Sequence, residues 1–201
     1  MTTLTAPRSS VDALLLNVSH VKLTVTPEHF DQLCLDNPDL RLELMKNGEL
    51  IVMPPTGGES GRKNISLGAD VEMWNRQTNL GEVFDSSTGY DFIAIGGGKV
   101  SPDVSWIEKS RLVGVKIVGF IPIVPDFVIE LRSATDSLKP LQEKMVEYRR
   151  LGVRLGLLIN PKNQQVEVYR LGQDVVVLEL PSAIDCEDVM PGFVLSMGRI
   201  W

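Results

Sequence analysis

The chain has 201 residues, of which 43% are hydrophobic and 23% charged, so it falls among ordinary globular proteins and outside the disordered and fibrous classes. A net charge of -6 argues against a protein that coats nucleic acid over its whole surface, although a local basic patch is still allowed. Cys34 and Cys186 are too few for a disulfide framework or a cysteine-based zinc site.

Residues 1–22 are rich in Thr and Ser and show no clear periodicity. They lack the pattern of a signal peptide, so we expect an N-terminal arm that packs on the body or on a partner subunit, followed by one domain over residues 23–201. The most apolar later stretch, LVGVKIVGFIPIVP, contains Lys116 and two prolines and is too short to cross a bilayer. We expect a cytoplasmic protein without membrane attachment.

The first half of the domain predicts a helix, a hairpin and a longer helix. TPEHFDQLCLDNP starts with Thr26 as an N-cap and Pro27 at the first helical position. Asn47-Gly48 within LRLELMKNGELIVMP is a strong hairpin signal. From about 60 to 78, apolar residues recur at helical spacing: Ile65, Leu67, Val71 and Trp74.

From Gly81 the chain changes to short apolar runs between turn residues, which predicts strands in GEVFDSSTG, YDFIAIGGGKV, SPDVSWIEK and PDFVIELRS. A helix over 140–151 ends at Gly152, and LGLLINP is a further strand, followed by a hairpin of QQVEVYRL and DVVVLEL. A single helix between two buried strands predicts a right-handed crossover that joins parallel strands. We therefore expect an α/β fold with a mixed central sheet, flanking helices and additional β-hairpins.

Glu130 is the unusual residue of the apolar run FVIEL, because a buried carboxylate needs a metal, a cation or hydrogen bonds. Asp126 precedes it by four residues on the same predicted strand, about 13 Å away, and cannot easily share an ion with it. Asp103 lies on the preceding predicted strand, which can pair side by side with FVIEL. Two adjacent carboxylates repel each other unless a cation such as Mg²⁺ neutralises them.

Five segments together resemble one known family: SPDVSW, PDFVIELRSATDS, LQEKMVEYRRLGVRLGLLINP, ELMKNGELIVMPP and PGFVL. They are similar to the Uma2 family (DUF820), whose members are endonucleases with the restriction-endonuclease-like PD-(D/E)xK fold, and the resemblance covers about residues 23–201. It implies a restriction-endonuclease-like core, with Asp103 and Glu130 as metal ligands. It also implies Mg²⁺ as cofactor, with Mn²⁺ as a substitute, and DNA as the partner.

The lysine of the general Glu-x-Lys pattern is replaced here by Arg132, which keeps the charge but cannot accept a proton. Members of the family are similar in carrying the lysine on the following helix, where this chain has Lys144. Helical geometry agrees, because Lys144 falls on the same arc as the apolar residues Leu141, Met145 and Tyr148. The alternative is a structural ion pair between Glu130 and Lys144.

Asp103 has a second interpretation, and two further acids, Glu59 and Glu43, are candidates of lower rank. Asp103 alternatively caps a turn at the start of its strand. Glu59 is either an acid of a first helical turn or a third carboxylate that faces the metal. Glu43, on the first hairpin, is a weaker candidate than Glu59.

The segment from Arg132 to Arg154 carries a net charge of +3, against -9 for the rest of the chain. Such a run is usually a solvated helix face. Beside a metal site it would follow a phosphate backbone, with Arg132 and Lys139 as contacts and Arg62 and Lys63 as additions.

We therefore expect a Mg²⁺-dependent endonuclease that hydrolyses DNA, in which Asp103 and Glu130 hold the ion and Lys144 positions the attacking water. One alternative is a weak or inactive nuclease-fold protein that binds nucleic acid or a protein partner. Another is an enzyme that acts on a small phosphorylated substrate. A homodimer is compatible with cleavage of both strands.

Overall fold

The computed structural model describes residues 21–201, so the expected N-terminal arm lies outside the described residues except for Val21 and Lys22. The helices are α1 (Pro27–Asp36), α2 (Gly58–Thr78) and α3 (Leu138–Leu151). The strands of the first half are β1 (Arg41–Leu44), β2 (Leu50–Met53), β3 (Gly81–Asp85), β4 (Tyr90–Asp91), β5 (Lys99–Val100) and β6 (Val104–Glu108). Those of the second half are β7 (Phe127–Leu131), β8 (Leu155–Asn160), β9 (Gln165–Arg170), β10 (Val176–Glu179), β11 (Ala183–Asp185) and β12 (Val194–Ser196).

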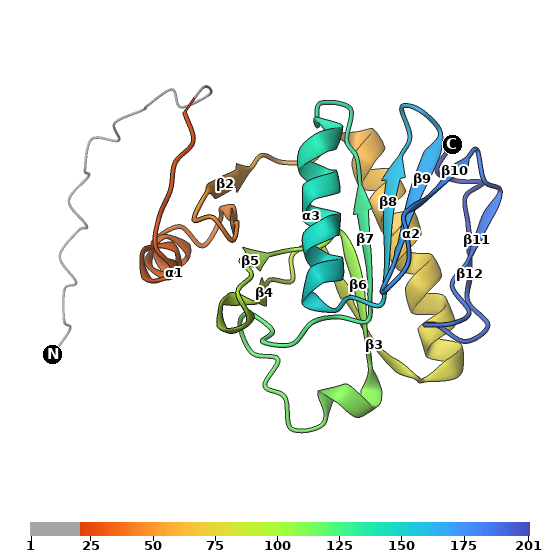
Figure 1. The fold of residues 1–201 in the computed structure, drawn as a ribbon, viewed down its shortest axis with the longest axis horizontal. Helices are drawn as coiled ribbons and strands as arrows, with labels where there is room; N and C mark the ends of the chain where they lie inside the picture. Colours follow the sequence, from red (N-terminus) through yellow and green to blue (C-terminus); the bar gives the residue numbers. More distant parts are fainter. Residues whose placement is uncertain (1–20) are drawn as a thin grey trace, which may run out of the picture.

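A six-stranded sheet of order β10-β9-β8-β7-β6-β3 forms the centre of the molecule. Strands β7 and β8, joined through α3, are parallel, and the other neighbours are antiparallel. Helix α3 covers one face of this sheet, whereas α2 and the β11–β12 hairpin lie on the other (Figure 1). The expected α/β architecture and the parallel crossover are confirmed.

A second, four-stranded sheet of order β2-β1-β5-β4 lies beside the central sheet, with α1 next to it (Figure 1). Its β1–β2 hairpin turns at Asn47-Gly48, where Gly48 has a φ of 82°, a conformation that favours glycine. Helix α1 begins as predicted, because the Thr26 hydroxyl accepts a hydrogen bond from the His29 amide. The small sheet places β1, and with it Glu43, close to α3.

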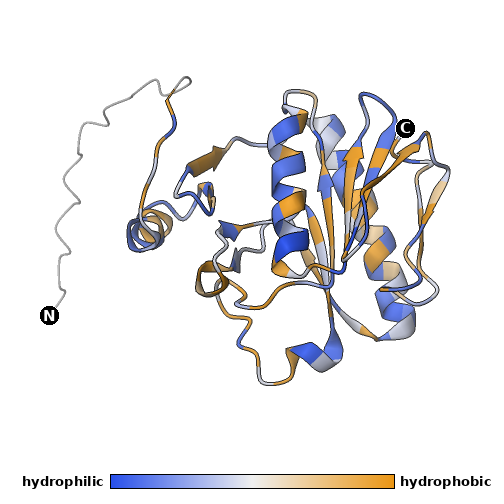
Figure 2. Cartoon of the chain, in the orientation of Figure 1, coloured by the Kyte–Doolittle hydropathy of each residue, from blue (hydrophilic) through white to orange (hydrophobic). Residues whose placement is uncertain are grey.

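The alternation of β7 decides which of its side chains face which helix. Phe127, Ile129 and Leu131 pack in the apolar cluster on the α2 side, whereas Val128 packs with Met145 of α3. Figure 2 shows hydrophobic residues in the strands of the central sheet and many hydrophilic residues along α3. Glu130, next in the alternation after Val128, is thereby directed to the α3 side.

One apolar residue of α2 departs from the expected pattern. The spacing of Ile65 predicted that it packs with Leu67 and Val71, but its side chain is 70% exposed while theirs are buried. No helix among residues 21–201 combines the length and apolar character needed to cross a membrane.

We expect Gly98→Ala to lower the free energy of unfolding by about 3 kcal/mol, because a Cβ at this position would collide with the Leu44 carbonyl oxygen of β1. Urea denaturation monitored by circular dichroism measures the change. Gly57→Ala is the comparison, since no atom lies within 4 Å of its Cβ position, and because Gly57 is the N-cap of α2 it should cost no more than about 1 kcal/mol. Equal stability of the two variants would show that the backbone at Gly98 can move away from Leu44 of β1 without loss of free energy.

Candidate active site

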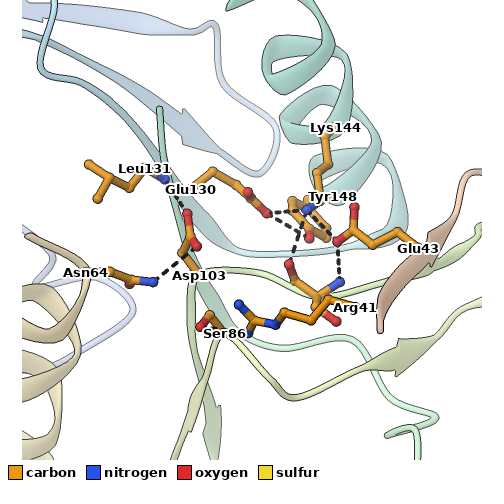
Figure 3. Close-up of polar contacts among 10 residues, drawn as sticks. Arg41, Glu43, Asn64, Ser86, Asp103, Glu130, Leu131, Lys144 and Tyr148 are labelled. Atoms are coloured by element: carbon orange, nitrogen blue, oxygen red, sulfur yellow. Dashed lines mark hydrogen bonds and ion pairs between the residues drawn. The ribbon is translucent and has the colours of Figure 1, made fainter. Parts of the chain in front are cut away.

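Glu130 is held at the centre of the site by two groups of α3. Its side chain is 4% exposed, and Lys144 Nζ lies 2.9 Å from its Oε1. The Tyr148 hydroxyl donates a hydrogen bond of 3.0 Å to the same oxygen. Figure 3 shows both helical side chains directed at the carboxylate. The buried acid in FVIEL is therefore compensated from the neighbouring helix.

Lys144 contacts three acceptors with its ammonium group, although the residue is only 8% exposed. Besides Glu130, Nζ donates to Glu43 Oε1 at 2.8 Å and to the Ser101 carbonyl oxygen at 3.2 Å. Burial alone would lower the pKa of Lys144, but the charges of Glu130 and Glu43 outweigh burial and raise it. The group stays protonated at neutral pH, so it acts as a hydrogen-bond donor and a positive charge.

Glu43 is the member of the site that sequence reasoning ranked too low. It is buried on β1 of the small sheet, and its Oε1 also accepts a hydrogen bond of 2.6 Å from the Ser101 amide. The available signal was local, because Glu43 lies between Leu42 and Leu44 much as Glu130 lies between Ile129 and Leu131. An acid inside a short apolar run indicated burial in both places.

Asp103 enters the site from the segment just before β6. Strands β6 and β7 pair with Val104 opposite Ile129, which brings Asp103 beside the end of β7. Its Oδ2 accepts a hydrogen bond of 2.8 Å from the Leu131 amide, and its Oδ1 accepts one of 3.2 Å from Asn64 Nδ2 of α2 (Figure 3). Burial raises the pKa of Asp103, while the Leu131 amide opposes that rise.

Within residues 21–201, this cluster sets the carboxylates of Glu43, Asp103 and Glu130 against the buried ammonium of Lys144. Burial raises the pKa of Glu130, and the charges of Asp103 and Glu43 add to the rise, although the positive charge of Lys144 opposes it. The positive charge of the Arg41 guanidinium lowers the pKa of Asp103 and so opposes the effect of burial. Negative charge in the cluster exceeds its closely bound positive charge.

The acceptors of the cluster are carboxylate oxygens, the ligand type that a hard divalent cation prefers. Excess negative charge on buried oxygens favours such an ion, and each carboxylate oxygen of Asp103 keeps acceptor capacity beyond its one hydrogen bond. Among the described residues, no group of three or more His, Cys, Asp or Glu side chains is arranged to hold a metal ion. Mg²⁺, which usually takes one or two carboxylates and completes its shell with water and phosphate oxygens, suits a pair such as Asp103 and Glu130.

The structure does not bring Glu59 into the cluster. Its side chain is 74% exposed and pairs with Lys63 one helical turn along α2, with 2.8 Å between Oε1 and Nζ. An acid in the first turn of a helix is favoured by the helix dipole, so the capping interpretation accounts for Glu59 and the metal-facing one does not.

The four basic residues expected along a phosphate backbone contact groups of their own chain. Arg62 donates to the Arg199 carbonyl oxygen at 3.1 Å, and Lys63 pairs with Glu59. Arg132 donates to the Asp136 carbonyl oxygen and to Asn160 Oδ1, so it anchors the loop after β7. Lys139 lies 4.0 Å from Glu143 on the exposed side of α3.

Comparisons with known proteins agree with this architecture. A model of the Uma2 family, described as "Putative restriction endonuclease", matches residues 27–198. The chain is similar to a crystal structure from Anabaena variabilis ATCC 29413, described as a putative nuclease belonging to DUF820. That similarity has 22% identity and a TM-score of 0.67, and it covers 79% of this chain and 88% of the other. No curated protein matches the chain. Because the family model spans most of the sequence, the chain belongs to the Uma2 family of restriction-endonuclease-like proteins.

Proposed function

We propose that the protein is a Mg²⁺-dependent endonuclease that hydrolyses phosphodiester bonds of DNA. The observation that carries this proposal is that Lys144 of α3 contacts the buried Glu130 of β7, while Asp103, from a third segment, accepts a hydrogen bond from the amide of Leu131, the residue after Glu130. Membership of a family described as putative restriction endonucleases supports the reaction class. A homodimer would let two such sites cut both strands.

Each residue has a distinct task in this proposal. Asp103 and Glu130 would hold Mg²⁺, which when bound would lower the pKa of a water molecule and stabilise charge on the phosphoryl oxygens. Lys144 would orient the attacking water, with one of its three N–H groups released from its present acceptor, or would neutralise a phosphoryl oxygen as a nearby positive charge; its raised pKa prevents it from acting as a base. The Leu131 amide and Asn64 orient Asp103, while Tyr148 orients Glu130.

Asp103→Asn is expected to slow Mg²⁺-dependent cleavage of supercoiled plasmid by about 100-fold or more, because it removes a carboxylate from the proposed ion. The Asn side chain keeps the size of Asp103 and an oxygen that can accept from the Leu131 amide, so the variant should stay folded. Conversion to nicked and linear plasmid on agarose gels measures the rate, with EDTA as the metal-free control.

Asp174→Asn makes the same chemical change at an exposed position between β9 and β10 and should cut at the wild-type rate. If Asp103→Asn cuts as fast as Asp174→Asn, or if wild-type cleavage persists in EDTA, the assignment is wrong. Binding of labelled DNA without cleavage in Mg²⁺ or Mn²⁺ would instead support the non-catalytic alternative.

A further inference from the structure

A pocket of about 500 Å³ opens beside Asp103, between the exposed face of α2 and the end of β3. Residues of α2 form one wall and the segment after β3 forms the other, with Arg41 between them. The lining residues used below are Arg41, Gly61, Ile65, Glu72, Asp85 and Asp103. Figure 3 shows Arg41, Ser86 and Asn64 around Asp103.

The charges of this pocket do not suit a run of phosphates. Apart from Asp103, its walls carry Asp85 and Glu72, of which Glu72 pairs with Arg76 at 2.7 Å. The one cation among the lining residues is Arg41, whose Nη2 donates to the Ser86 hydroxyl at 3.0 Å. A phosphodiester chain laid along these walls would meet net negative charge. A neutral group with hydrogen-bond donors, such as a nucleobase or a sugar, meets acceptors instead.

The α2 wall offers an apolar contact that the fold itself does not use. Ile65 is 70% exposed and lines the pocket, and beside it the side-chain-poor positions Gly61, Gly68 and Ala69 leave the helix surface flat. A flat surface with a protruding aliphatic side chain suits the face of a planar ring. Ile65 was expected in the core but is exposed. A base that packs against Ile65 would remove this apolar side chain from water.

The basic residues near the pocket are also poorly placed to bind a continuous duplex. Arg62, Lys63 and Arg132 are bound to groups of their own chain, so they do not form a free cationic track for two phosphate backbones. We propose that the pocket receives the sugar and base of one unpaired nucleotide whose phosphate lies at Asp103, and that the substrate is unpaired DNA. This inference rests on the proposed nuclease function and names its substrate class.

Labelled DNA of one sequence, prepared as a single strand, a fork and a blunt duplex, tests the substrate class. We expect Mg²⁺-dependent cleavage of the single strand and of the unpaired arms of the fork at least tenfold faster than cleavage of the duplex. Fluorescence anisotropy with Ca²⁺ in place of Mg²⁺ should show the same order of binding.

Gly61→Phe tests the pocket itself, because Gly61 lines the pocket and no atom lies within 4 Å of its Cβ position, so a bulky side chain there would occupy the space proposed for the base. We expect cleavage and binding of the single strand to fall at least tenfold with a Tm no lower than that of the wild type. Gly58→Phe is the matched control on the same helix, since its Cβ position is also open but lies outside the pocket, and it should behave as wild type.

Equal cleavage of the three DNAs, or wild-type binding by Gly61→Phe, would overturn the inference while leaving the proposed nuclease function intact. Absence of metal-dependent cleavage of every DNA would overturn the nuclease function. In that case the anisotropy measurements still decide the inference, because a preference for unpaired DNA that is lost in Gly61→Phe supports the pocket and equal binding refutes it.

Discussion

Glu130→Gln should slow Mg²⁺-dependent cleavage by about 100-fold or more. Its free energy of unfolding should be higher than that of the wild type or lower by no more than about 1 kcal/mol. Glutamine keeps the shape of Glu130 and an oxygen that accepts from Tyr148 and Lys144, but it removes one charge from a buried cluster with excess negative charge. Plasmid cleavage and urea denaturation, measured on the same preparation, test both halves of this expectation.

Glu143→Gln provides the comparison, because Glu143 lies on α3, the helix that supplies the partners of Glu130, but is exposed and lies 4.0 Å from Lys139. We expect it to change neither cleavage nor stability, since exposed ion pairs contribute little. A stable Glu130→Gln protein that still cuts plasmid would exclude Glu130 as a ligand of an essential ion. A clear loss of stability would show that the negative charge of Glu130 stabilises the folded state.

Lys144→Met should lose cleavage and also lower the free energy of unfolding by about 3–5 kcal/mol. The substitution keeps an unbranched side chain but leaves the buried carboxylates of Glu43 and Glu130 without their common cation. Urea denaturation gives the stability change, and oligonucleotide or plasmid cleavage at a temperature where the variant is folded gives the activity. Lys139→Met, at an exposed position of α3, should leave both unchanged.

A second substitution separates the structural role of Lys144 from the proposed catalytic one. Adding Glu43→Gln to Lys144→Met removes one of the two stranded charges, so part of the lost stability should return while cleavage stays absent. Recovery of cleavage in the double variant would show that the ammonium only neutralises Glu43. Unchanged stability in Lys144→Met would show that the two carboxylates do not depend on it.

Much of the fold follows from local patterns. Asn47-Gly48 predicted the β1–β2 hairpin because few residue pairs suit that turn, and Thr26 with Pro27 predicted the start of α1. The contact of Lys144 with Glu130 was also foreseeable, since a lysine on the apolar arc of a helix needs an acid and a buried acid needs a cation. Their catalytic role stays a prediction.

The errors arose where tertiary placement decides. Glu59 stood in the first turn of a predicted helix, but no periodicity tells how that turn is rotated relative to the sheet, and the acid faces solvent with Lys63. Glu43 belongs to a separate small sheet, and its approach to Lys144 joins residues far apart in the chain, which the hairpin pattern alone could not predict. Ile65 matched helical spacing but lies on the exposed side of α2.

Lys144 and Tyr148 reach the same oxygen of Glu130 from successive turns of α3. One residue inserted between them would rotate one side chain by about 100° around the helix axis and remove it from the carboxylate. An insertion in the loop of residues 133–137 would leave the spacing of Lys144 and Tyr148 intact. We therefore expect length variation among relatives to occur before α3 and to spare the four-residue spacing of Lys144 and Tyr148.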